Sequence, residues 1–285
     1  MDATRETDDE QTRLWNGPSG NAWVELQEPL DRMFKPIEDL FVREILAGAK
    51  RRVLDVGCGS GSTTLAVARA LGEQGQAVGI DLSEPLIAVA QARAEREKSP
   101  ATFIRANAQT HAFEPASFDM FISRFGVMFF EDPVRAFANL LHAASDDAET
   151  RFIVWRSPAE NPFMTTAERA AAPLLPNMPP RRPDAPGQFA FADQRRVTRI
   201  LEESGWAEID MHPIDIPCSF PEKDLVRYLT RLGPVGQILQ EADERTRTQV
   251  MGQVRAAFDP YVHGSEIRFA AACWMICARR SLSGA

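Results

Sequence analysis

The stretch that decides the fold is Val53-Leu-Asp-Val-Gly-Cys-Gly-Ser-Gly61. A short apolar run, typical of a buried strand, is followed by three glycines at alternate positions, and a helical pattern begins near Ser62. Glycine permits positive φ and close approach of the backbone to a ligand, and a helix N-terminus presents unpaired N–H groups. Asp81 ends the next predicted strand, where a carboxylate can bind a ribose diol. The stretch therefore predicts a nucleotide-type ligand at this turn.

Outward from this turn, short apolar runs alternate with helical patterns, which is the signature of βα units and a parallel sheet. Strands are expected at 53–56, 77–81, 103–106, 118–123, 152–155, 208–216 and 267–278. Helices are expected at 62–71, 84–96, 132–141 and 195–204, with Ser83 and Asp193 as N-caps of the second and the fourth. The predicted fold class is α/β.

The segments outside this pattern suggest additional parts. Residues 23–47 carry apolar positions at helical spacing and predict one or two helices. Two insertions rich in Phe, Pro, Leu and Met are expected to form a lid over the carboxyl ends of the strands. The predicted division is 1–48 N-terminal helical segment, 49–156 nucleotide-binding core, 157–192 proline-rich insertion, 193–216 core helix and sixth strand, 217–265 helical insertion, and 266–285 last strand and tail.

Composition excludes several classes of protein. The chain has 285 residues and a formal net charge of −8, which argues against a polyanion-binding face. No apolar run approaches the roughly 20 residues that cross a bilayer, and the polar start MDATRETDDEQTR resembles neither a signal nor a transit peptide. We therefore expect a cytoplasmic protein. The four cysteines have neither disulfide nor zinc spacing, and no metal site is expected.

Two families of nucleotide-binding protein compete for the glycine turn. The dehydrogenase pattern G-x-G-x-x-G/A fits poorly, because Ser62 stands at the third conserved position. The spacing Asp55-x-Gly57-x-Gly59-x-Gly61 instead resembles motif I of class I S-adenosylmethionine (SAM) methyltransferases. Asp81 in Asp-Leu-Ser, Asn107-Ala-Gln109, and the block FDMFISRFGVMFF at 118–130 resemble the later motifs of that family, in the same order.

The segment upstream, WNGPSGNAWVELQEPLDRMFKPI at 15–37, is similar to the N-terminal segment of methyltransferases related to the ubiquinone/menaquinone C-methyltransferases. The resemblance implies a Rossmann-like, seven-stranded, mostly parallel sheet with helices on both faces, its last strand antiparallel between the fifth and sixth, plus a helical lid. It also implies SAM as cofactor and S-adenosylhomocysteine as product. The cofactor-binding residues that it predicts are Trp23, Arg32, Asp55, Gly57, Cys58, Gly59, Gly61, Thr63, Asp81, Leu82, Asn107, Ala108, Gln109, Ser123 and Phe125.

The methyl acceptor is expected to be a small, largely apolar molecule. The residues expected to bind it are Phe125, Met128, Phe163, Tyr228 and Leu232. Methyl transfer needs alignment more than acid–base chemistry, so no catalytic residue is assigned. The candidates for such a role are His111, Arg124 and Tyr228.

Two other functions stay open at this point: an NAD(P)-dependent oxidoreductase on a Rossmann fold, and a SAM-binding protein without catalysis. Nucleic acid is not an expected partner, because the N/D-P-P-Y/F motif of amine-methylating enzymes is replaced by Ser123-Arg-Phe-Gly126 after the fourth strand. The oligomeric state is expected to be a monomer or a homodimer.

Overall fold

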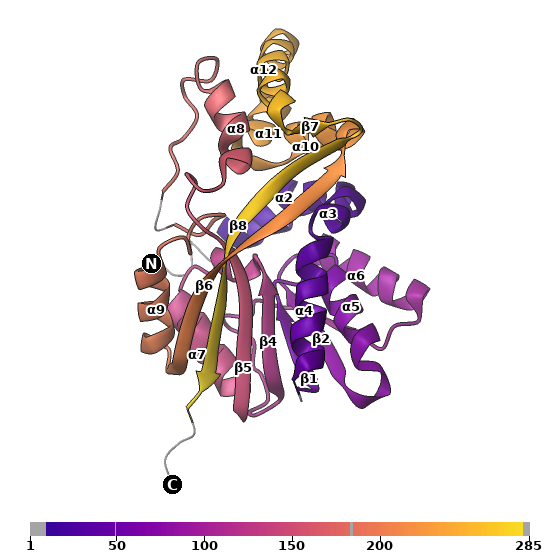
Figure 1. Cartoon of the computed structure of the whole chain (residues 1–285), viewed down its shortest axis with the longest axis vertical. Coiled ribbons are helices and arrows are strands. Elements are labelled where there is room, and N and C mark those ends of the chain that lie inside the picture. The colour runs from indigo at the N-terminus through magenta and orange to yellow at the C-terminus, as the bar shows by residue number, and fades with distance from the viewer. Residues whose placement is uncertain (1–9, 49, 183–184, 282–285) are drawn as a thin grey trace.

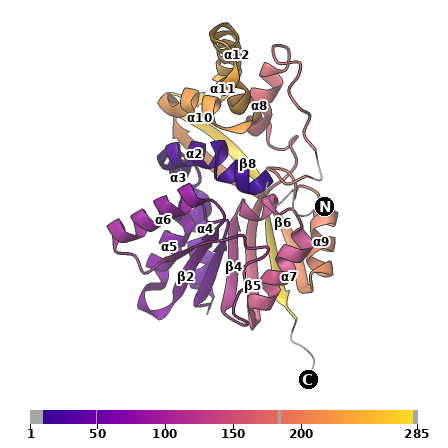
Figure 2. The ribbon, with the colours of Figure 1, turned by 180° about the vertical axis from the view of Figure 1, so that it is seen from behind.

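The computed structural model describes residues 10–48, 50–182 and 185–281. The first nine residues and the last four, which the sequence assigns to the N-terminal segment and the tail, lie outside this range. One central sheet organises the described chain, with helices on both of its faces and a group of helices beyond one end of it (Figures 1 and 2).

The sheet has the strand order β3-β2-β1-β4-β5-β8-β6, and the two-residue β7 pairs with β8. Strands β1 to β5 run parallel to one another, while β8 is antiparallel to both β5 and β6. The predicted α/β sheet, with its last strand antiparallel between the fifth and sixth, is confirmed. The strands are β1 Arg52–Val56, β2 Gln76–Asp81, β3 Thr102–Arg105, β4 Phe118–Arg124, β5 Ala144–Trp155, β6 Trp206–Pro221, β7 Val262–His263 and β8 Glu266–Arg280.

The chain leaves β1 toward β2 and leaves β4 toward β5 in opposite directions along the sheet. Because such crossovers are right-handed, α5 and α6 cover one face and α7 covers the other. Helix α4 packs on α5, and α9 packs on α7. The helices are α2 Pro18–Glu25, α3 Gln27–Met33, α4 Lys35–Ala47, α5 Ser62–Leu71, α6 Glu84–Glu97, α7 Pro133–Ala143, α8 Pro162–Ala171, α9 Gln194–Glu203, α10 Leu225–Arg231, α11 Gly233–Glu241 and α12 Glu244–Ala257.

The sixth strand is longer than its sequence pattern predicts. It continues to Pro221, five residues into the segment expected to be a helical insertion, and pairs with β8 along that length. Together β6 and β8 form a two-stranded arm that rises from the sheet to α8, α10, α11 and α12 (Figure 1). We call these four helices the cap. Helices α2 and α3 lie between the cap and the sheet (Figure 2).

The core explains why these segments fold as they do. Strands β1 and β4 are apolar and buried on both faces, as central parallel strands are. The first helices bury one apolar stripe, with Leu26, Met33, Ile37 and Phe41 at or near zero exposure. The expected one or two helices in this region are three, and Leu26 and Phe34 are the residues that join them.

One of the two predicted helix caps, Asp193, is confirmed, and Asp132 caps α7 in the same way. Asp132 accepts a hydrogen bond from the backbone N–H of Arg135, and Asp193 accepts from the N–H groups of Arg195 and Arg196. The prediction for Ser83 is wrong, because its hydroxyl donates to the carbonyl of Trp15 instead. The N-terminus of α6 is capped from outside, by Asn16.

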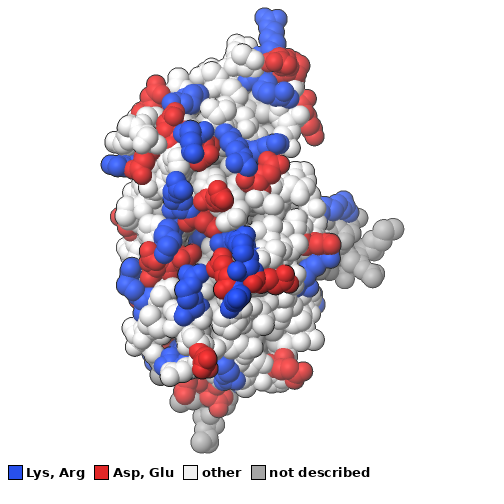
Figure 3. All heavy atoms as spheres, turned by 90° about the vertical axis from the view of Figure 1, so that its right-hand side faces the viewer, with Lys and Arg blue, Asp and Glu red and all other residues white. Residues whose placement is uncertain are grey.

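The surface carries both signs of charge. On the face that Figure 3 shows, Lys and Arg alternate with Asp and Glu over the whole length of the molecule. In the described part of the chain, no helix is long and apolar enough to span a bilayer.

Candidate cofactor and acceptor cavities

A first cavity of about 120 Å³ lies at the carboxyl ends of β1, β2, β3 and β4. Twelve of the fifteen predicted cofactor residues line it. They are Trp23, Asp55, Gly57, Cys58, Gly59, Thr63, Asp81, Leu82, Asn107, Ala108, Gln109 and Phe125. We call it the cofactor cavity, since a nucleotide-type ligand is expected there.

The glycine turn forms the floor of the cofactor cavity. Gly57 and Gly59 have φ angles of +69° and +54°, which favour glycine. The N–H groups of Gly57 and Cys58 both donate to the carbonyl of Ile80, which fastens the turn to β2. A Cβ atom on Gly59 would meet nothing within 4 Å, so this position opens into free space.

Two carboxylates lie at the turn, the half-buried Asp81 and the buried Asp55. Asp81 accepts hydrogen bonds from the N–H groups of Gly59 and Ser83, both at 2.9 Å, and burial raises its pKa. Asp55 is 2% exposed and accepts from the Thr64 hydroxyl at 2.7 Å. Burial raises the pKa of Asp55 to about 6, while that hydrogen bond and the charge of Arg124 oppose the rise.

The loop after β3 is ordered by its own side chains. The amide oxygen of Asn107 accepts from the backbone N–H of Gln109 at 2.9 Å, which closes a tight turn. Gln109 in turn accepts from the N–H of Asp132 at 3.0 Å and so joins the loop to the start of α7. This arrangement keeps Asn107 and Ala108 at the wall of the cofactor cavity.

A second cavity of about 350 Å³ lies between the sheet, α2 to α4 and the cap. All five residues predicted to bind the acceptor line it, namely Phe125, Met128, Phe163, Tyr228 and Leu232. Its walls include several aromatic rings: Phe125 stacks on Trp155 with ring centroids 4.5 Å apart, and Phe163 stacks on Phe269 at 3.9 Å. We call it the acceptor cavity.

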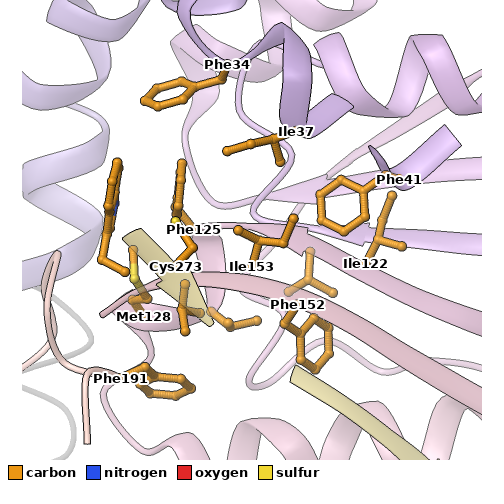
Figure 4. Packing of buried hydrophobic residues seen from close by; sticks show 14 of the residues in the cluster. Phe34, Ile37, Phe41, Ile122, Phe125, Met128, Phe152, Ile153, Phe191 and Cys273 are labelled. Atoms are coloured by element: carbon orange, nitrogen blue, oxygen red, sulfur yellow. The ribbon is translucent and has the colours of Figure 1, made fainter. Parts of the chain in front are cut away.

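The two cavities adjoin. Five residues line both of them and form a shared wall, namely Trp15, Trp23, Leu30, Phe125 and Phe129. Phe125 has a φ of +68°, a strained value for an aromatic residue. Its ring lies 5.2 Å from that of Phe34 at the edge of the buried cluster (Figure 4). A ligand in one cavity is therefore separated from a ligand in the other by side chains alone.

Four predicted site residues line neither cavity. Arg32 lies on α3, whose Asp31 lines the cofactor cavity in its place. Gly61 begins α5, where a Cβ would lie 2.7 Å from the ring of Phe103. The Ser123 hydroxyl donates to Val56 O and accepts from the N–H of Gly126, so it holds the loop after β4. The His111 ring packs edge-on against Phe113.

The structure adds residues to the cofactor cavity that sequence motifs did not identify. They are Gln11, Trp15, Gln27, Leu30, Asp31, Val56, Ser60, Ile80, Leu86, Ala106, Gly126, Phe129, Phe130 and Glu131, together with Arg124, which the sequence offers as a catalytic candidate. The helices before the sheet supply Trp15, Gln27 and Asp31. Asp31 is held by Arg93 at 2.9 Å and by Gln27 at 2.5 Å. Helical periodicity in the N-terminal segment could have indicated which face points inward, but not what it faces.

The cofactor cavity is acidic. Its charged lining residues are Asp31, Asp55, Asp81, Glu131 and Arg124, so among the described residues one cation faces four carboxylates. Within the same described ranges, no group of three or more His, Cys, Asp and Glu side chains could hold a metal ion. The thiol of Cys58 is buried at the floor, where burial raises its pKa well above its ordinary value and keeps it protonated.

Comparison with known proteins finds similarity in the part of the chain that carries the glycine turn. Residues 53–146 match the family model described as a methyltransferase domain. A ubiquinone/menaquinone biosynthesis C-methyltransferase (UbiE) from Rhizobium leguminosarum is 40% identical over 78 residues, which are 27% of this chain and 30% of that protein. The chain thus aligns with about a third of the length of this curated relative.

Solved structures share the fold over most of the chain. The YcgJ protein of Bacillus subtilis has a TM-score of 0.57 at 17% identity, and the match covers 86% of this chain and 97% of that one. A phosphoethanolamine N-methyltransferase from Haemonchus contortus, solved with S-adenosylhomocysteine, has a TM-score of 0.52 at 17% identity, covering 86% and 53%. Strand order and glycine turn agree with these matches: residues 53–146 resemble a methyltransferase domain, and the chain shares the fold of these solved structures.

Proposed function

We propose that this chain transfers a methyl group from SAM to a small, largely apolar molecule. The observation that carries the proposal is the pair of adjoining cavities, one with carboxylates at the glycine turn and the other rich in aromatic side chains, with Phe125 and Trp23 in their shared wall. An enzyme that moves a group between two ligands needs two such sites in contact. A protein that only binds SAM would need one.

The charges of the cofactor cavity suit SAM. With its sulfonium, ammonium and carboxylate groups, SAM carries a net positive charge, and the Asp55 and Asp81 carboxylates at the glycine turn attract such a ligand. A dinucleotide would have to place its pyrophosphate against the same carboxylates. This is the physical reason for preferring SAM over NAD(P), in addition to the glycine spacing.

Individual residues have distinct proposed roles at the cofactor. Asp81 is positioned to accept hydrogen bonds from the ribose hydroxyls, since it ends β2 and is held by the N–H of Gly59. The turn from Asn107 to Gln109 would contact the adenine ring. Thr63, whose buried hydroxyl has no hydrogen-bond partner among the described residues, offers a free donor to the methionine end.

SAM supplies an activated methyl group, so that the acceptor's electron pair forms the new bond while the carbon–sulfur pair returns to sulfur. The residues of this chain have to align the acceptor and exclude water. No histidine lines either cavity in the described chain, and the Glu168 carboxylate of the acceptor cavity is paired with Arg181. We therefore propose that the aromatic walls promote methyl transfer mainly by holding the acceptor in position.

The acceptor is proposed to be apolar because of the wall that would contact it. Phe34, Phe125, Trp155 and Phe163 present rings to the acceptor cavity, and apolar ligands bury their surface against such walls. The curated relative is a methyltransferase of ubiquinone and menaquinone biosynthesis, and this supports an apolar acceptor.

We further propose that the chain works in the cytoplasm, as a monomer or homodimer, and without nucleic acid. The net charge of −8 and the mixed charges of the face in Figure 3 support the last point, since nucleic-acid binding depends on a basic surface.

Calorimetry tests the cofactor first. SAM and S-adenosylhomocysteine should each bind at one site per chain, and NADH should not bind. Turnover is then measured as S-adenosylhomocysteine released in the presence of candidate acceptors. Binding of NADH without SAM would refute the proposal, and SAM binding with no turnover on any apolar acceptor would favour a SAM-binding protein without catalysis.

A further inference from the structure

Arg124 is the last residue of β4, and its guanidinium is incompletely satisfied. Its Nη1 atom is buried without a hydrogen-bond partner among the residues that the structure describes. Within those residues it also makes no ion pair, although its positive charge opposes the rise in the pKa of Asp55. A buried charge without a partner is costly, so such a group is retained where a ligand completes it.

The guanidinium lies where the two cavities meet. It lines the cofactor cavity, yet its Cζ is 5.5 Å from the ring centroid of Phe34, which lines only the acceptor cavity. Its charge also reaches Cys218 on the β6 arm: burial raises the pKa of Cys218 to about 12, and Arg124 opposes that rise. The contact with Phe34 places the cation at the boundary of the acceptor cavity.

A second donor lies in the acceptor cavity. Tyr228 donates to the sulfur of Met164 at 3.7 Å, and thioether sulfur is a weak acceptor. Burial raises the pKa of the Tyr228 phenol, so the group stays protonated. The acceptor cavity and its boundary with the cofactor cavity thus present two donors with weak or missing partners, the Tyr228 hydroxyl and the Arg124 guanidinium.

We propose that Arg124 binds an anionic oxygen of the methyl acceptor, and that the acceptor is a flat apolar molecule bearing a carboxylate or an ionised phenol. This inference rests on the proposed function. The sulfonium of SAM and the guanidinium are both positive, and at close range they repel each other. An anionic oxygen between them relieves that repulsion and accepts a hydrogen bond from Nη1. Tyr228 is the proposed second donor to the acceptor.

The competing partner for Arg124 is the carboxylate of the cofactor itself. The contact with Phe34 favours the acceptor, because it draws the guanidinium toward the aromatic cavity. The two partners predict different losses when Arg124 is replaced. An acceptor anchor leaves cofactor affinity intact, whereas a cofactor anchor does not.

The test measures binding to the protein saturated with S-adenosylhomocysteine, by calorimetry. Naphthoate is compared with the neutral acetylnaphthalene, and para-nitrophenolate with para-nitroanisole, so that carboxylate and phenolate are tested separately. At least one anionic probe should bind wild type about tenfold more tightly than its neutral partner. Arg124→Met should abolish that ratio, Arg124→Lys should keep part of it, and both should keep S-adenosylhomocysteine affinity within about threefold.

Arg105→Met is the matched control, because Arg105 ends the parallel strand β3 but pairs at the surface with Glu84, at 2.7 Å. It should change neither quantity. Equal affinity of wild type for anionic and neutral probes, or no binding of either anion, would overturn the inference. So would a loss of S-adenosylhomocysteine affinity in Arg124→Met with the probe ratio unchanged. Failure of wild type to bind S-adenosylhomocysteine would instead reject the proposed function.

Discussion

Gly57 and Gly126 cross in backbone contact: a Cβ atom on Gly57 would lie 2.6 Å from the Cα of Gly126. A Cβ on Gly126 would lie 2.5 Å from the carbonyl oxygen of Val56. The turn after β1 and the loop after β4 therefore touch where both must be glycine. This contact positions Phe125, the neighbour of Gly126, between the cofactor and the acceptor cavities.

Replacement of these glycines should have unequal effects on the fold. Gly126→Ala and Gly57→Ala should each lower the free energy of unfolding by several kcal/mol, since rigid backbone atoms occupy the space of the new methyl group. Gly59→Ala should cost only about 1 kcal/mol for its positive φ, because that position is open. Urea denaturation compares the three variants. Equal losses would show that the backbone crossing does not limit the fold.

Asp81 should be needed for cofactor affinity. Asp81→Ala removes a charged hydrogen-bond acceptor worth roughly 1.5–3 kcal/mol, so S-adenosylhomocysteine should bind about tenfold to a hundredfold more weakly. Glu84→Gln is the control, because Glu84 is nearby but outside both cavities. Calorimetry measures both variants. An Asp81→Ala variant that binds as tightly as wild type would contradict the ribose assignment.

The cofactor cavity could largely be predicted from sequence because its parts are local. Asp55, Gly57 and Asp81 stand at strand ends, and parallel strands bring their carboxyl ends to one edge. The contact of Gly57 with Gly126 joins segments distant in the chain, and no local pattern encodes it. The same holds for Trp15 and Asp31, which reach the cavity from helices that precede the sheet.

The full length of β6 could not be predicted from the sequence for a different reason. Pro217 and Pro221 argue against a strand in sequence, since proline cannot donate to a ladder. The structure tolerates them because β6 is an edge strand that pairs only with β8 in this sheet of described residues. Arg32 does not line the cofactor cavity and its neighbour Asp31 does, because periodicity locates a helix, while the side chain that faces a cavity depends on how the helix packs.

The raised pKa of Asp55 predicts that the free energy of unfolding depends on pH. Burial raises its pKa from 3.8 to about 6, against the hydrogen bond from Thr64 and the charge of Arg124. The folded chain favours the protonated carboxyl, so this contribution to the free energy of unfolding is greatest below about pH 4 and is lost as the pH rises through about 6. The shift corresponds to about 3 kcal/mol. Asp55→Asn should therefore gain stability relative to wild type at neutral pH, and less at pH 4, in urea denaturation.

Thr64→Val provides the comparison for Asp55. It removes a hydrogen bond that favours the ionised carboxylate, so it should destabilise the ligand-free chain more at neutral pH than near pH 4. If the free energy of unfolding changed with pH in the same way for wild type and Asp55→Asn, groups other than Asp55 would cause the pH dependence.

Asn16 should control how long the cofactor stays bound. Its side chain accepts from the N–H of Glu84 at 2.8 Å and donates to the carbonyl of Leu82 at 3.2 Å, and so fastens Trp15 over the cofactor cavity. Asn16→Ala should cost about 1 kcal/mol of stability as a lost helix cap. It should also speed S-adenosylhomocysteine dissociation severalfold, measured by stopped-flow tryptophan fluorescence. Asn21→Ala, on the exposed side of α2, is the control; equal rates in both would leave Asn16 without this role.

Leu232 should tune acceptor use without changing the cofactor site. It lines the acceptor cavity at the end of α10, is partly exposed, and does not line the cofactor cavity. Phe163 is a poorer choice for this test, because it is 2% exposed and stacks on Phe269, so that its removal would also cost about 3–5 kcal/mol of stability.

Leu232→Ala enlarges the acceptor cavity. It should raise the KM for a small apolar acceptor, or shift the preference toward a larger acceptor, by about three- to tenfold. S-adenosylhomocysteine affinity should stay unchanged. Val226→Ala is matched in chemistry and lies on the same helix, but it is 51% exposed and outside both cavities, so it should behave as wild type. The acceptor does not bind where the cap meets the sheet if Leu232→Ala has the same acceptor preference and KM as wild type. The same conclusion follows if Leu232→Ala weakens cofactor binding by as large a factor as it raises the KM for the acceptor.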